Sequence, residues 1–549
     1  SGSSSPHGMA YNPTDGKVYF AAYDPTYNWE LYTTNGTSFT VTDINPGSAY
    51  SDPYGFIYYP LTGQMYFAAN NPIAGYELYT VQAGVPIMLA DFSAVGGSYP
   101  NYFTVSNNTL FVNAYDGSNY QFYSTTDGTS FSPVTGFGTA TGINLTIPDG
   151  TGGVYLENYD ATNGYELWYA NSTSASLVKD IFAGANGSYP NNFLYQNGEL
   201  YFNASSQNHG SELWKSDGTS VGTIEVINTN IGSDSNPNSF LATASQLMFR
   251  ADNGVKGSEP WTSDGSSANT ALLKDVQFGA GSSYPTFLNQ TPINGLYFFT
   301  ADDGTHGAEL WKTNGLTSGT ALMTDINVGA SGSNPSAAVV FNNMLYFTAY
   351  EASTGYELYK TDGTTTSLVA DLNPGTGYGS AYFQTPVVLG SYLFFVGNDG
   401  VNGWELYYTD GTSYGMVVDL NPGAGDGYPT GLVTTGTGFF FAAYDASYDR
   451  ELYYSDGTTF GTYRVADLNP SGSSSPNYIS ALNGKVVFSA FDGGSTYGTE
   501  AWVSDGTPGG TFVLADVWPG NSGAIYNMQS AGNYVYFGAY NPTLGYELY

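Results

Sequence analysis

The chain lacks cysteine, has little positive charge and contains no long apolar run, and each absence limits what it can be. Without cysteine there are no disulfides and no thiolate metal sites. Lys and Arg together number 11 against 46 Asp and Glu, which gives the 549 residues a formal net charge of −35. Such a charge repels nucleic-acid phosphates and anionic lipid surfaces, so we expect neither as a partner. No apolar run approaches the roughly 18 residues of a membrane-spanning helix, so we expect no membrane insertion.

Residues with catalytic chemistry are also few. The three histidines, His7, His209 and His306, are far apart in the sequence, and neither a phosphate-binding glycine loop nor a zinc motif is present. A pair of carboxylates alone can hydrolyse a glycosidic bond, but no pair stands out among the 46 acidic residues. We therefore predict that the protein is not an enzyme and rank a carboxylate-dependent glycosidase third among its functions.

What the sequence does contain is a short phrase, Glu-Leu-Tyr or a close variant, repeated twelve times. Its first residue stands at positions 30, 77, 121, 166, 212, 259, 309, 357, 405, 451, 500 and 547. The spacing runs from 44 to 50 residues and averages 47, a period typical of repeat architectures. Residues that recur in every repeat are expected to build a scaffold.

The first repeat indicates what one unit forms. Residues 9–11, 17–23, 30–33 and 39–42 are β-prone and are separated by turn residues, including Asn35 and Gly36. No segment has helical periodicity, so we predict a four-stranded antiparallel meander. The residue two places before the motif Glu is Gly in nine repeats and Asn or Asp in the others, which predicts a left-handed backbone conformation there.

The second strand of each repeat predicts how the repeats pack. One face passes from large to small along Val18, Phe20 and Ala22, as expected for sheets that pack radially. We therefore predict an all-β fold, a β-propeller built from twelve four-stranded antiparallel repeats. Because propellers have about 4–8 blades, we expect two six-bladed rings, residues 1–283 and 284–549. A seven-plus-five division and a single large ring remain alternatives.

One repeat carries a resemblance to a known family. The segment Gly210-Ser211-Glu212-Leu213-Trp214-Lys215-Ser216-Asp217-Gly218-Thr219, followed by Gly222-Thr223, resembles the ELWxxDGT-repeat proteins. The resemblance extends over the whole chain, with Tyr in place of Trp in seven repeats. It implies a secreted or surface protein with a propeller-like fold. It implies no active site, so no catalytic residue is transferred.

The recurring acidic residues allow two interpretations. In the first, each carboxylate accepts backbone N–H bonds in its own turn. In the second, a loop Asp and the motif Glu flank one hairpin and bind Ca²⁺, the one cofactor that the sequence suggests. The candidate Ca²⁺ ligands are Asp24, Glu30, Asp160, Glu166, Asp252, Glu259, Asp302, Glu309, Asp445 and Glu451.

Two further features concern the surface. Seven Asn-X-Ser/Thr sequons would permit glycosylation of a secreted protein: Asn35, Asn107, Asn144, Asn171, Asn186, Asn203 and Asn289. Tyrosines precede proline in several loops that leave the repeats: Tyr99, Tyr189, Tyr284 and Tyr428. If exposed, they would suit contacts with glycans or surface proteins, and the alternative is packing between repeats.

The twelfth repeat ends at Tyr549, on its third predicted strand. An unpaired strand edge is a template for pairing with another chain. We expect a neighbouring copy to supply the missing strand, which would give head-to-tail self-association into a filament or lattice; the alternative is a tail beyond this sequence. Together these features predict an extracellular structural or adhesive protein of the cell surface, with a lectin-like, carbohydrate-binding propeller as the alternative.

Overall fold

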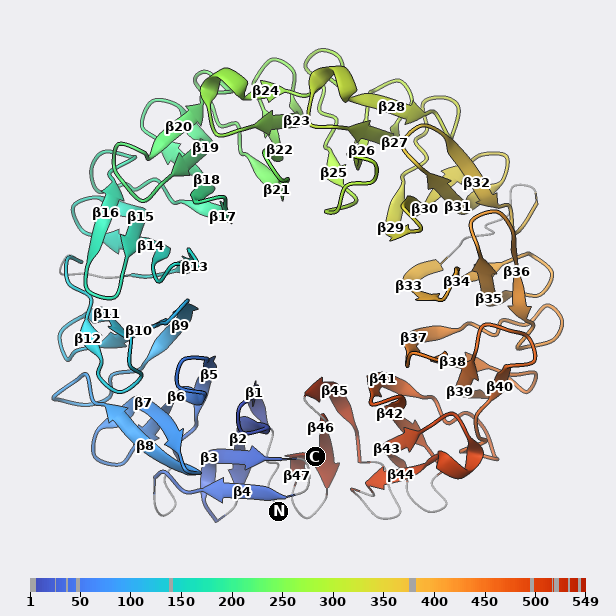
Figure 1. Ribbon diagram of the computed structural model, residues 1–549, viewed down its shortest axis with the longest axis horizontal. Coiled ribbons are helices and arrows are strands. Elements are labelled where there is room, and N and C mark those ends of the chain that lie inside the picture. The colour runs from blue at the N-terminus through green and yellow to red at the C-terminus, as the bar shows by residue number, and fades with distance from the viewer. Residues whose placement is uncertain are drawn as a thin grey trace. The chain divides into compact units, whose positions relative to one another are not determined.

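The computed structural model describes residues 6–24, 26–35, 38–45, 50–137, 142–374, 382–493, 498–515, 517, 523–531, 534–541 and 545–549. In this part the chain is all-β, with eleven four-stranded antiparallel sheets and one three-stranded sheet (Figure 1). The predicted all-β class and the four-stranded antiparallel repeat are confirmed. Closure of the sheets into rings stays a prediction.

The first six sheets follow one another along the chain. Their strands are β1 (His7–Asn12), β2 (Lys17–Asp24), β3 (Asn28–Thr34), β4 (Phe39–Thr42); β5 (Tyr54–Tyr59), β6 (Gln64–Asn71), β7 (Gly75–Gln82), β8 (Val85–Ala90); β9 (Asn101–Ser106), β10 (Thr109–Tyr115), β11 (Tyr120–Thr125), β12 (Ser132–Pro133); β13 (Leu145–Pro148), β14 (Val154–Asp160), β15 (Gly164–Ala170), β16 (Ala175–Lys179); β17 (Asn191–Gln196), β18 (Glu199–Ser206), β19 (Gly210–Ser216), β20 (Ile224–Ile227); β21 (Asn238–Ala242), β22 (Leu247–Asp252), β23 (Ser258–Ser263) and β24 (Ala271–Leu272).

The remaining six sheets repeat the same order, and three short 3₁₀ helices lie in the turns. The strands are β25 (Thr286–Phe287), β26 (Tyr297–Asp302), β27 (Ala308–Thr313), β28 (Ala321–Thr324); β29 (Ser336–Phe341), β30 (Met344–Glu351), β31 (Gly355–Thr361), β32 (Thr366–Ala370); β33 (Tyr382–Leu389), β34 (Tyr392–Asn398), β35 (Trp404–Thr409), β36 (Tyr414–Val418); β37 (Thr430–Thr434), β38 (Phe439–Tyr444), β39 (Arg450–Ser455), β40 (Thr462–Arg464); β41 (Asn477–Leu482), β42 (Lys485–Phe491), β43 (Thr499–Ser504), β44 (Phe512–Ala515); β45 (Tyr526–Ala531), β46 (Tyr534–Asn541) and β47 (Gly545–Leu548). The helices are η1 (Ser267–Asn269), η2 (Thr317–Gly319) and η3 (Pro508–Gly510).

Each sheet is a simple meander in which consecutive strands pair antiparallel. The second and third strands form the longest ladder, for example from Val154 opposite Ala170 to Asp160 opposite Gly164. The motif Glu lies in the third strand, two residues after the loop that closes this hairpin. The position of the motif residue and the direction of its strand are therefore the same from sheet to sheet.

The chain divides into two compact units. One consists of Ser1–Val255, Ser263–Ala271 and Thr543–Leu548, and the other of Lys256–Thr262, Leu272–Pro542 and Tyr549. Within each unit the first strands of successive sheets touch one another, as β5 touches β9 and β33 touches β37. The expected ring boundary near residue 283 stays a prediction.

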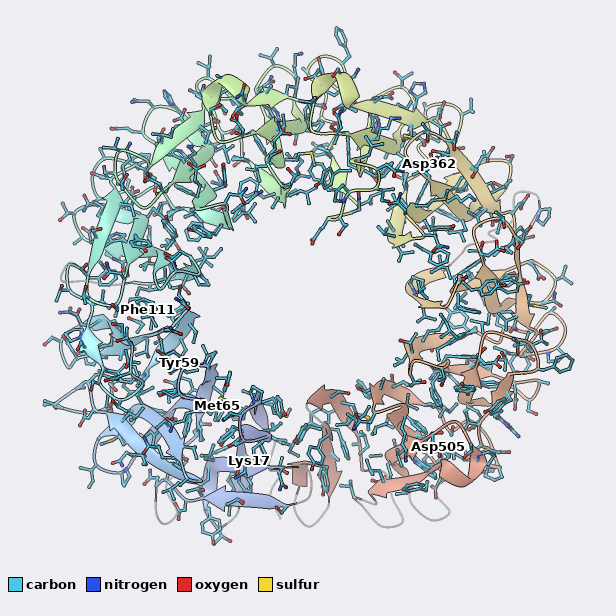
Figure 2. The ribbon with its side chains drawn as sticks, viewed as in Figure 1. Lys17, Tyr59, Met65, Phe111, Asp362 and Asp505 are labelled. Atoms are coloured by element: carbon cyan, nitrogen blue, oxygen red, sulfur yellow. The ribbon has the colours of Figure 1, made fainter. Side chains whose placement is uncertain are left out.

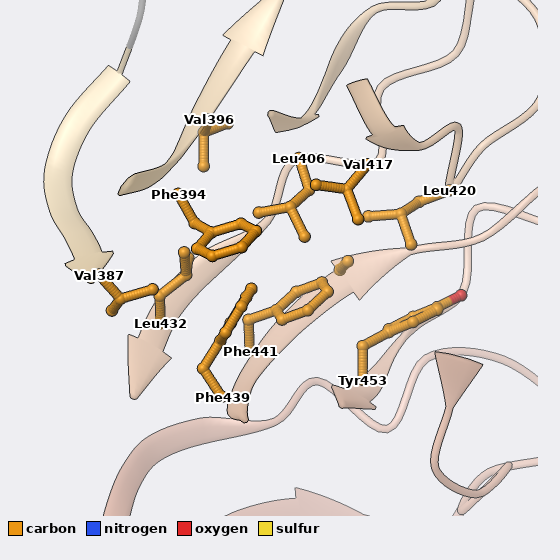
Figure 3. Packing of buried hydrophobic residues seen from close by; sticks show 11 residues of the cluster. Val387, Phe394, Val396, Leu406, Val417, Leu420, Leu432, Phe439, Phe441 and Tyr453 are labelled. Carbon is orange, nitrogen blue, oxygen red and sulfur yellow. The ribbon is translucent and has the colours of Figure 1, made fainter. Parts of the chain in front are cut away.

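The core lies between successive sheets, at boundaries that we call seams. The second strand is buried on both faces, and the predicted large-to-small series Val18, Phe20 and Ala22 is buried throughout. At the seam between the ninth sheet (β33–β36) and the tenth (β37–β40), Phe394 and Leu406 pack against side chains of the tenth sheet such as Phe441 (Figure 3). Burial of aliphatic and aromatic surface at a seam of this kind stabilises the fold by about 25 cal/mol per Å².

No helix in the described part of the chain is long and apolar enough to cross a membrane.

Candidate functional site: a buried glutamate clasp

The motif glutamates are buried, although glutamate is normally an exposed residue. Ten of them have no exposed side-chain surface: Glu30, Glu77, Glu166, Glu212, Glu259, Glu309, Glu357, Glu405, Glu451 and Glu500. The third repeat has a half-buried Gln121 at this position, and the side chain of Glu547 lies outside the described residues. A buried carboxylate is stable only when hydrogen-bond donors surround it, so these side chains must have partners.

Glu166 on β15 shows the partners. Its carboxylate accepts the backbone N–H of Ile181 at 3.1 Å, the N–H of Phe182 at 2.9 Å and the hydroxyl of Ser188 at 2.5 Å. All three donors belong to the loop that leaves the fourth sheet (β13–β16) for the fifth (β17–β20). The glutamate therefore fixes this exit loop against its own sheet.

Ser188 also connects the two sheets through its backbone. Its N–H donates to the carbonyl of Tyr165, next to Glu166, at 2.7 Å. Its own carbonyl accepts the N–H of Ser205, near the end of β18 in the following sheet, at 2.8 Å. Glutamate, serine and these backbone groups together form what we call the glutamate clasp, which joins one sheet to the next.

The clasp recurs along the chain. Among the described residues, a serine hydroxyl donates to the motif glutamate in seven repeats, through Ser51, Ser98, Ser188, Ser235, Ser283, Ser333 and Ser474. The carbonyl of each of these serines accepts an N–H from the next sheet. In the ninth repeat Gly427 replaces the serine, and its N–H still donates to Glu405 at 2.8 Å. The backbone part of the clasp therefore persists without the hydroxyl.

The residue after each clasp serine has a left-handed backbone. Tyr189 has a φ of 51°, and Tyr99, Asn236, Tyr284 and Asn334 have similar values. This conformation aims two consecutive N–H groups, those of Ser188 and Tyr189, at the single carbonyl of Tyr165. A proline follows in each case, and it has no N–H that would need a partner.

The glycine two places before the motif Glu completes the contact. Gly164 has a φ of 71°, and a Cβ there would lie 2.5 Å from the backbone N of Gly187 in the exit loop. The predicted left-handed conformation is confirmed at Gly164, at the eight equivalent positions 28, 75, 210, 257, 307, 355, 403 and 498, and is wrong at Asn119 and Asp449. In those two loops the positive φ falls instead on Gly117 and Tyr448.

Burial controls the ionisation of the clasp. Desolvation raises the pKa of Glu166 to about 7, although its hydrogen bonds from Ser188, Phe182 and Ile181 act in the opposite direction. Burial likewise raises the pKa of Glu30, Glu77, Glu405 and Glu451 to about 7. These carboxyl groups therefore titrate near neutral pH.

The predicted Ca²⁺ ligands have other roles in the described residues. Asp160 accepts the N–H groups of Thr162 and Asn163 in its own loop, at 2.8 and 3.0 Å, while its predicted partner Glu166 binds the exit loop. Asp252 and Asp302 accept similar bonds from Gly254 and Gly304, each at 2.7 Å. The side chain of Asp24 lies outside the described residues.

The last candidate, Asp445, accepts the N–H of Ser447 at 2.8 Å and pairs with Arg464 at 3.0 Å. Its partner Glu451 accepts bonds from Leu468 and Ser474. No group of three His, Cys, Asp or Glu residues that could hold a metal occurs in the part of the chain that the structure describes. The Ca²⁺ hypothesis stays a prediction.

The turn between the third and fourth strands uses a second set of carboxylates. Asp362, labelled with Asp505 in Figure 2, accepts the N–H groups of Thr364 and Thr365 at 2.7 and 2.9 Å. These bonds, with that of the Thr364 hydroxyl, hold the pKa of Asp362 well below its usual range. Asp127 and Asp410 have similar partners and lowered pKa values. This geometry matches the interpretation in which recurring carboxylates accept backbone N–H bonds.

The sequons differ in exposure. Asn107, Asn144, Asn171 and Asn186 are exposed, and Asn35 is half-buried. Two others are buried, and both are engaged: Asn203 accepts the hydroxyl of Ser211, and Asn289 accepts the N–H of Phe298. Glycosylation of any of them stays a prediction.

The tyrosines before proline are exposed, as the interpretation of a contact surface requires. Tyr99, Tyr189, Tyr284 and Tyr428 are between 39% and 64% exposed. Three also touch the sheet that their loop leaves: between ring centroids, Tyr99 lies 5.6 Å from Tyr76, Tyr189 lies 5.5 Å from Tyr165 and Tyr428 lies 6.1 Å from Trp404. These ring contacts pack the tyrosines against the sheet that their loop leaves, and a role in contacts with glycans or surface proteins stays a prediction.

Sequence reasoning missed the clasp serines. Their signal was the recurring Ser-X-Pro in the exit loops, as in Ser188-Tyr189-Pro190, which the prediction used only for its tyrosines. The histidines also have partners: His209 contacts Glu225 at 2.8 Å, and His306 contacts Asp303 at 2.5 Å.

No family model matches the chain, and no curated protein matches it. Among solved structures it is similar to the tricorn protease, with a TM-score of 0.25 and 12% identity over 97% of this chain and 46% of that one. It is also similar to the GH74 xyloglucanase from Xanthomonas campestris, with a TM-score of 0.24 and 12% identity over 88% of this chain and 72% of that one. The chain spans less than half of the tricorn protease chain, and TM-scores this low carry no argument about activity. On its repeated four-stranded sheets, the chain is a β-propeller-like repeat protein.

Proposed function

We propose that this chain is a non-enzymatic, extracellular structural or adhesive repeat protein. The observation that carries the proposal is the glutamate clasp. The carboxylate that recurs in nearly every sheet has no exposed surface and accepts bonds from the loop that leads to the next sheet. A carboxylate in this position cannot reach a substrate, so its repetition is explained by assembly of the scaffold.

The finer architecture that we propose is two six-bladed rings, residues 1–283 and 284–549. It is supported by the number of repeated sheets and by the usual size of propellers, about 4–8 blades. An extracellular or cell-surface location is supported by the resemblance to ELWxxDGT-repeat proteins and by the four exposed sequons. We further propose head-to-tail self-association into a filament or lattice.

Two measurements on the purified full chain test this proposal. Sedimentation velocity with negative-stain electron microscopy should detect assemblies that grow with protein concentration. A panel of chromogenic glycosides and peptides should show no turnover. A monodisperse monomer at every concentration would contradict self-association, and turnover that is lost in a carboxylate variant would contradict the non-enzymatic role.

A carbohydrate-binding, lectin-like role is the second candidate, and the exposed tyrosines favour it. Tyr284 is 64% exposed and stands at the left-handed position of its exit loop. A largely exposed ring is what a stacking platform for a sugar requires. A glycan array should retain the wild-type chain and lose signal with Tyr284→Ala; equal retention of both would argue against sugar binding at this loop.

A further inference from the structure

The Asp-Gly turn of one sheet packs against the second and third strands of the preceding sheet. A Cβ at Gly411 in the ninth sheet would meet the hydroxyl of Tyr346 on β30, and a Cβ at Gly457 in the tenth would meet the ring of Phe394 on β34. The glycine carbonyl of this turn is thus placed beside residues of its neighbour and can accept a bond from them.

At two seams a lysine supplies that bond. Lys312 on β27 donates its ammonium to the carbonyl of Gly363 at 2.5 Å, and Lys360 on β31 donates to the carbonyl of Gly411. At the seam between the tenth and eleventh sheets the donor is the hydroxyl of Tyr463 on β40, which lies 3.0 Å from the carbonyl of Gly506. At the seam between the second and third sheets the donor is the hydroxyl of Tyr66 on β6, which lies 2.8 Å from the carbonyl of Gly128. The chain therefore satisfies this carbonyl from three different positions.

The seam between the ninth and tenth sheets has none of these donors, and Phe394, which has no hydroxyl, takes the place of Tyr66. Tyr408 on β35 occupies the position that Lys360 occupies on β31. In the ninth sheet Tyr408 pairs with Phe394 of the second strand, as Lys360 pairs with Tyr346 of the second strand in the eighth. Gly415 takes the place of Tyr463, since it pairs with Tyr408 as Tyr463 pairs with Tyr454.

Phe394 points into the apolar core of the seam (Figure 3). Among the described residues no side chain donates to the carbonyl of Gly457. The turn carbonyl, which accepts a lysine ammonium at two other seams, can therefore accept a hydrogen bond from another donor at this seam.

A pocket of about 290 Å³ lies at this place, lined by Tyr392, Tyr408, Val417, Gly457, Thr458 and Thr459. The tyrosine rings stand nearly perpendicular, at 87°, with centroids 5.5 Å apart, and Tyr392 is 42% exposed. The ring of Tyr408 lies over Gly415, whose missing side chain leaves room for it. Tyr408 and Gly415, which stand in place of the donors, therefore also shape the pocket.

The chemistry of the pocket favours a cation. Aromatic faces attract ammonium groups. Asp456 accepts the N–H and hydroxyl of Thr458 at 2.8 and 2.7 Å, which places a carboxylate in the same turn. The net charge of −35 adds a long-range attraction for cations.

We propose that this pocket binds a primary alkylammonium group, either the side chain of a lysine on another protein or a free polyamine. The ammonium occupies the position that the Lys360 ammonium fills at the preceding seam and donates to the Gly457 carbonyl, and its alkyl chain lies against Tyr392 and Tyr408. This assignment is independent of the structural role proposed above.

Isothermal titration of the full chain with cadaverine and with an Nα-acetylated lysine tripeptide tests the proposal. We expect saturable binding of at least one probe and loss of binding when its amines are acetylated. Tighter binding of the tripeptide indicates a lysine of a partner protein, and tighter binding of cadaverine indicates a free polyamine. No saturable binding of either probe, equal binding of the acetylated probes, or binding of methyl glucoside alone would overturn the proposal.

Tyr408→Lys is the decisive variant, because it gives this seam the donor of the preceding one. The new lysine should occupy the pocket and weaken binding at least ~10-fold. Tyr454→Lys is the matched control, since the Gly506 carbonyl is already bonded by Tyr463, and its affinity should equal that of the wild type. If Tyr408→Lys does not fold, Tyr392→Leu removes one aromatic face and should also weaken binding. Wild-type affinity in the folded Tyr408→Lys or Tyr392→Leu chain refutes the site.

Discussion

Replacing Ser188 by alanine removes one hydroxyl from a clasp and leaves its backbone bonds in place. The hydroxyl lies 2.5 Å from the carboxylate of Glu166, and both residues are fully buried. A hydrogen bond to a charged group contributes about 1.5–3 kcal/mol, and a neutral one about 0.5–1.5 kcal/mol. Because the pKa of Glu166 is about 7, we expect Ser188→Ala to cost the larger amount at about pH 8 and the smaller at about pH 5.

Equilibrium urea unfolding followed by tryptophan fluorescence measures this cost, and Trp168 on the same strand is a buried reporter. Ser353→Ala is the control, since its hydroxyl also donates to a glutamate, Glu351 at 2.9 Å, but on the exposed surface. The control should change the free energy of unfolding by less than about 0.5 kcal/mol. A loss in Ser188→Ala no larger than in the control would refute the reasoning.

Three other predictions follow from the same contacts. Since burial raises the folded pKa of Glu30, Glu405 and their equivalents above the ordinary value of 4.5, their contribution to stability is fully present below that value and is lost as the pH rises through about 7. Thermal melting followed by circular dichroism should therefore give a lower midpoint at about pH 8 than at about pH 5, and a higher midpoint at the alkaline pH would contradict the assignment. In urea unfolding, Gly164→Ala should destabilise the chain by about 1–3 kcal/mol more than Gly16→Ala. Both glycines have left-handed φ values, of 71° and 69°, but only at Gly164 does the backbone of the exit loop lie against the position that a Cβ would take. Equal losses would show that the close contact is unimportant. Dialysis against EDTA should leave the melting midpoint unchanged, since the described motif glutamates already have protein donors; a midpoint that falls with EDTA and recovers with Ca²⁺ would support the calcium hypothesis.

The repeat could be predicted from the sequence because its signals are local. Alternation of β-prone residues, turn pairs such as Asn35-Gly36 and the glycine before the motif Glu each act over a few residues. They were sufficient for the strand order β1–β4 and for the left-handed position at Gly164. They failed at Asp449, where the positive φ moved to Tyr448 within a loop of different sequence.

The clasp could not be predicted in the same way, because its partners are about 22 residues apart. The recurrence of Glu166 and of Ser188 was visible, but only the fold shows that the exit loop returns to the strand it left. The pocket at Tyr392 and Tyr408 was hidden for a related reason: Phe394, Tyr408 and Gly415 depart from the repeat within the ninth sheet, and only the fold places them beside the Gly457 turn of the tenth sheet.

The central claim, that the recurring glutamate and the exit-loop serine act together to join successive sheets, is tested most directly by a double-mutant cycle. The free energy of unfolding would be measured at about pH 8 for the wild type, Glu166→Gln, Ser188→Ala and the double variant. We expect a coupling energy of about 1–3 kcal/mol, because the hydroxyl and the carboxylate lie 2.5 Å apart with no exposed surface. Effects that add to within about 0.3 kcal/mol would show that the two residues act independently and would contradict the clasp.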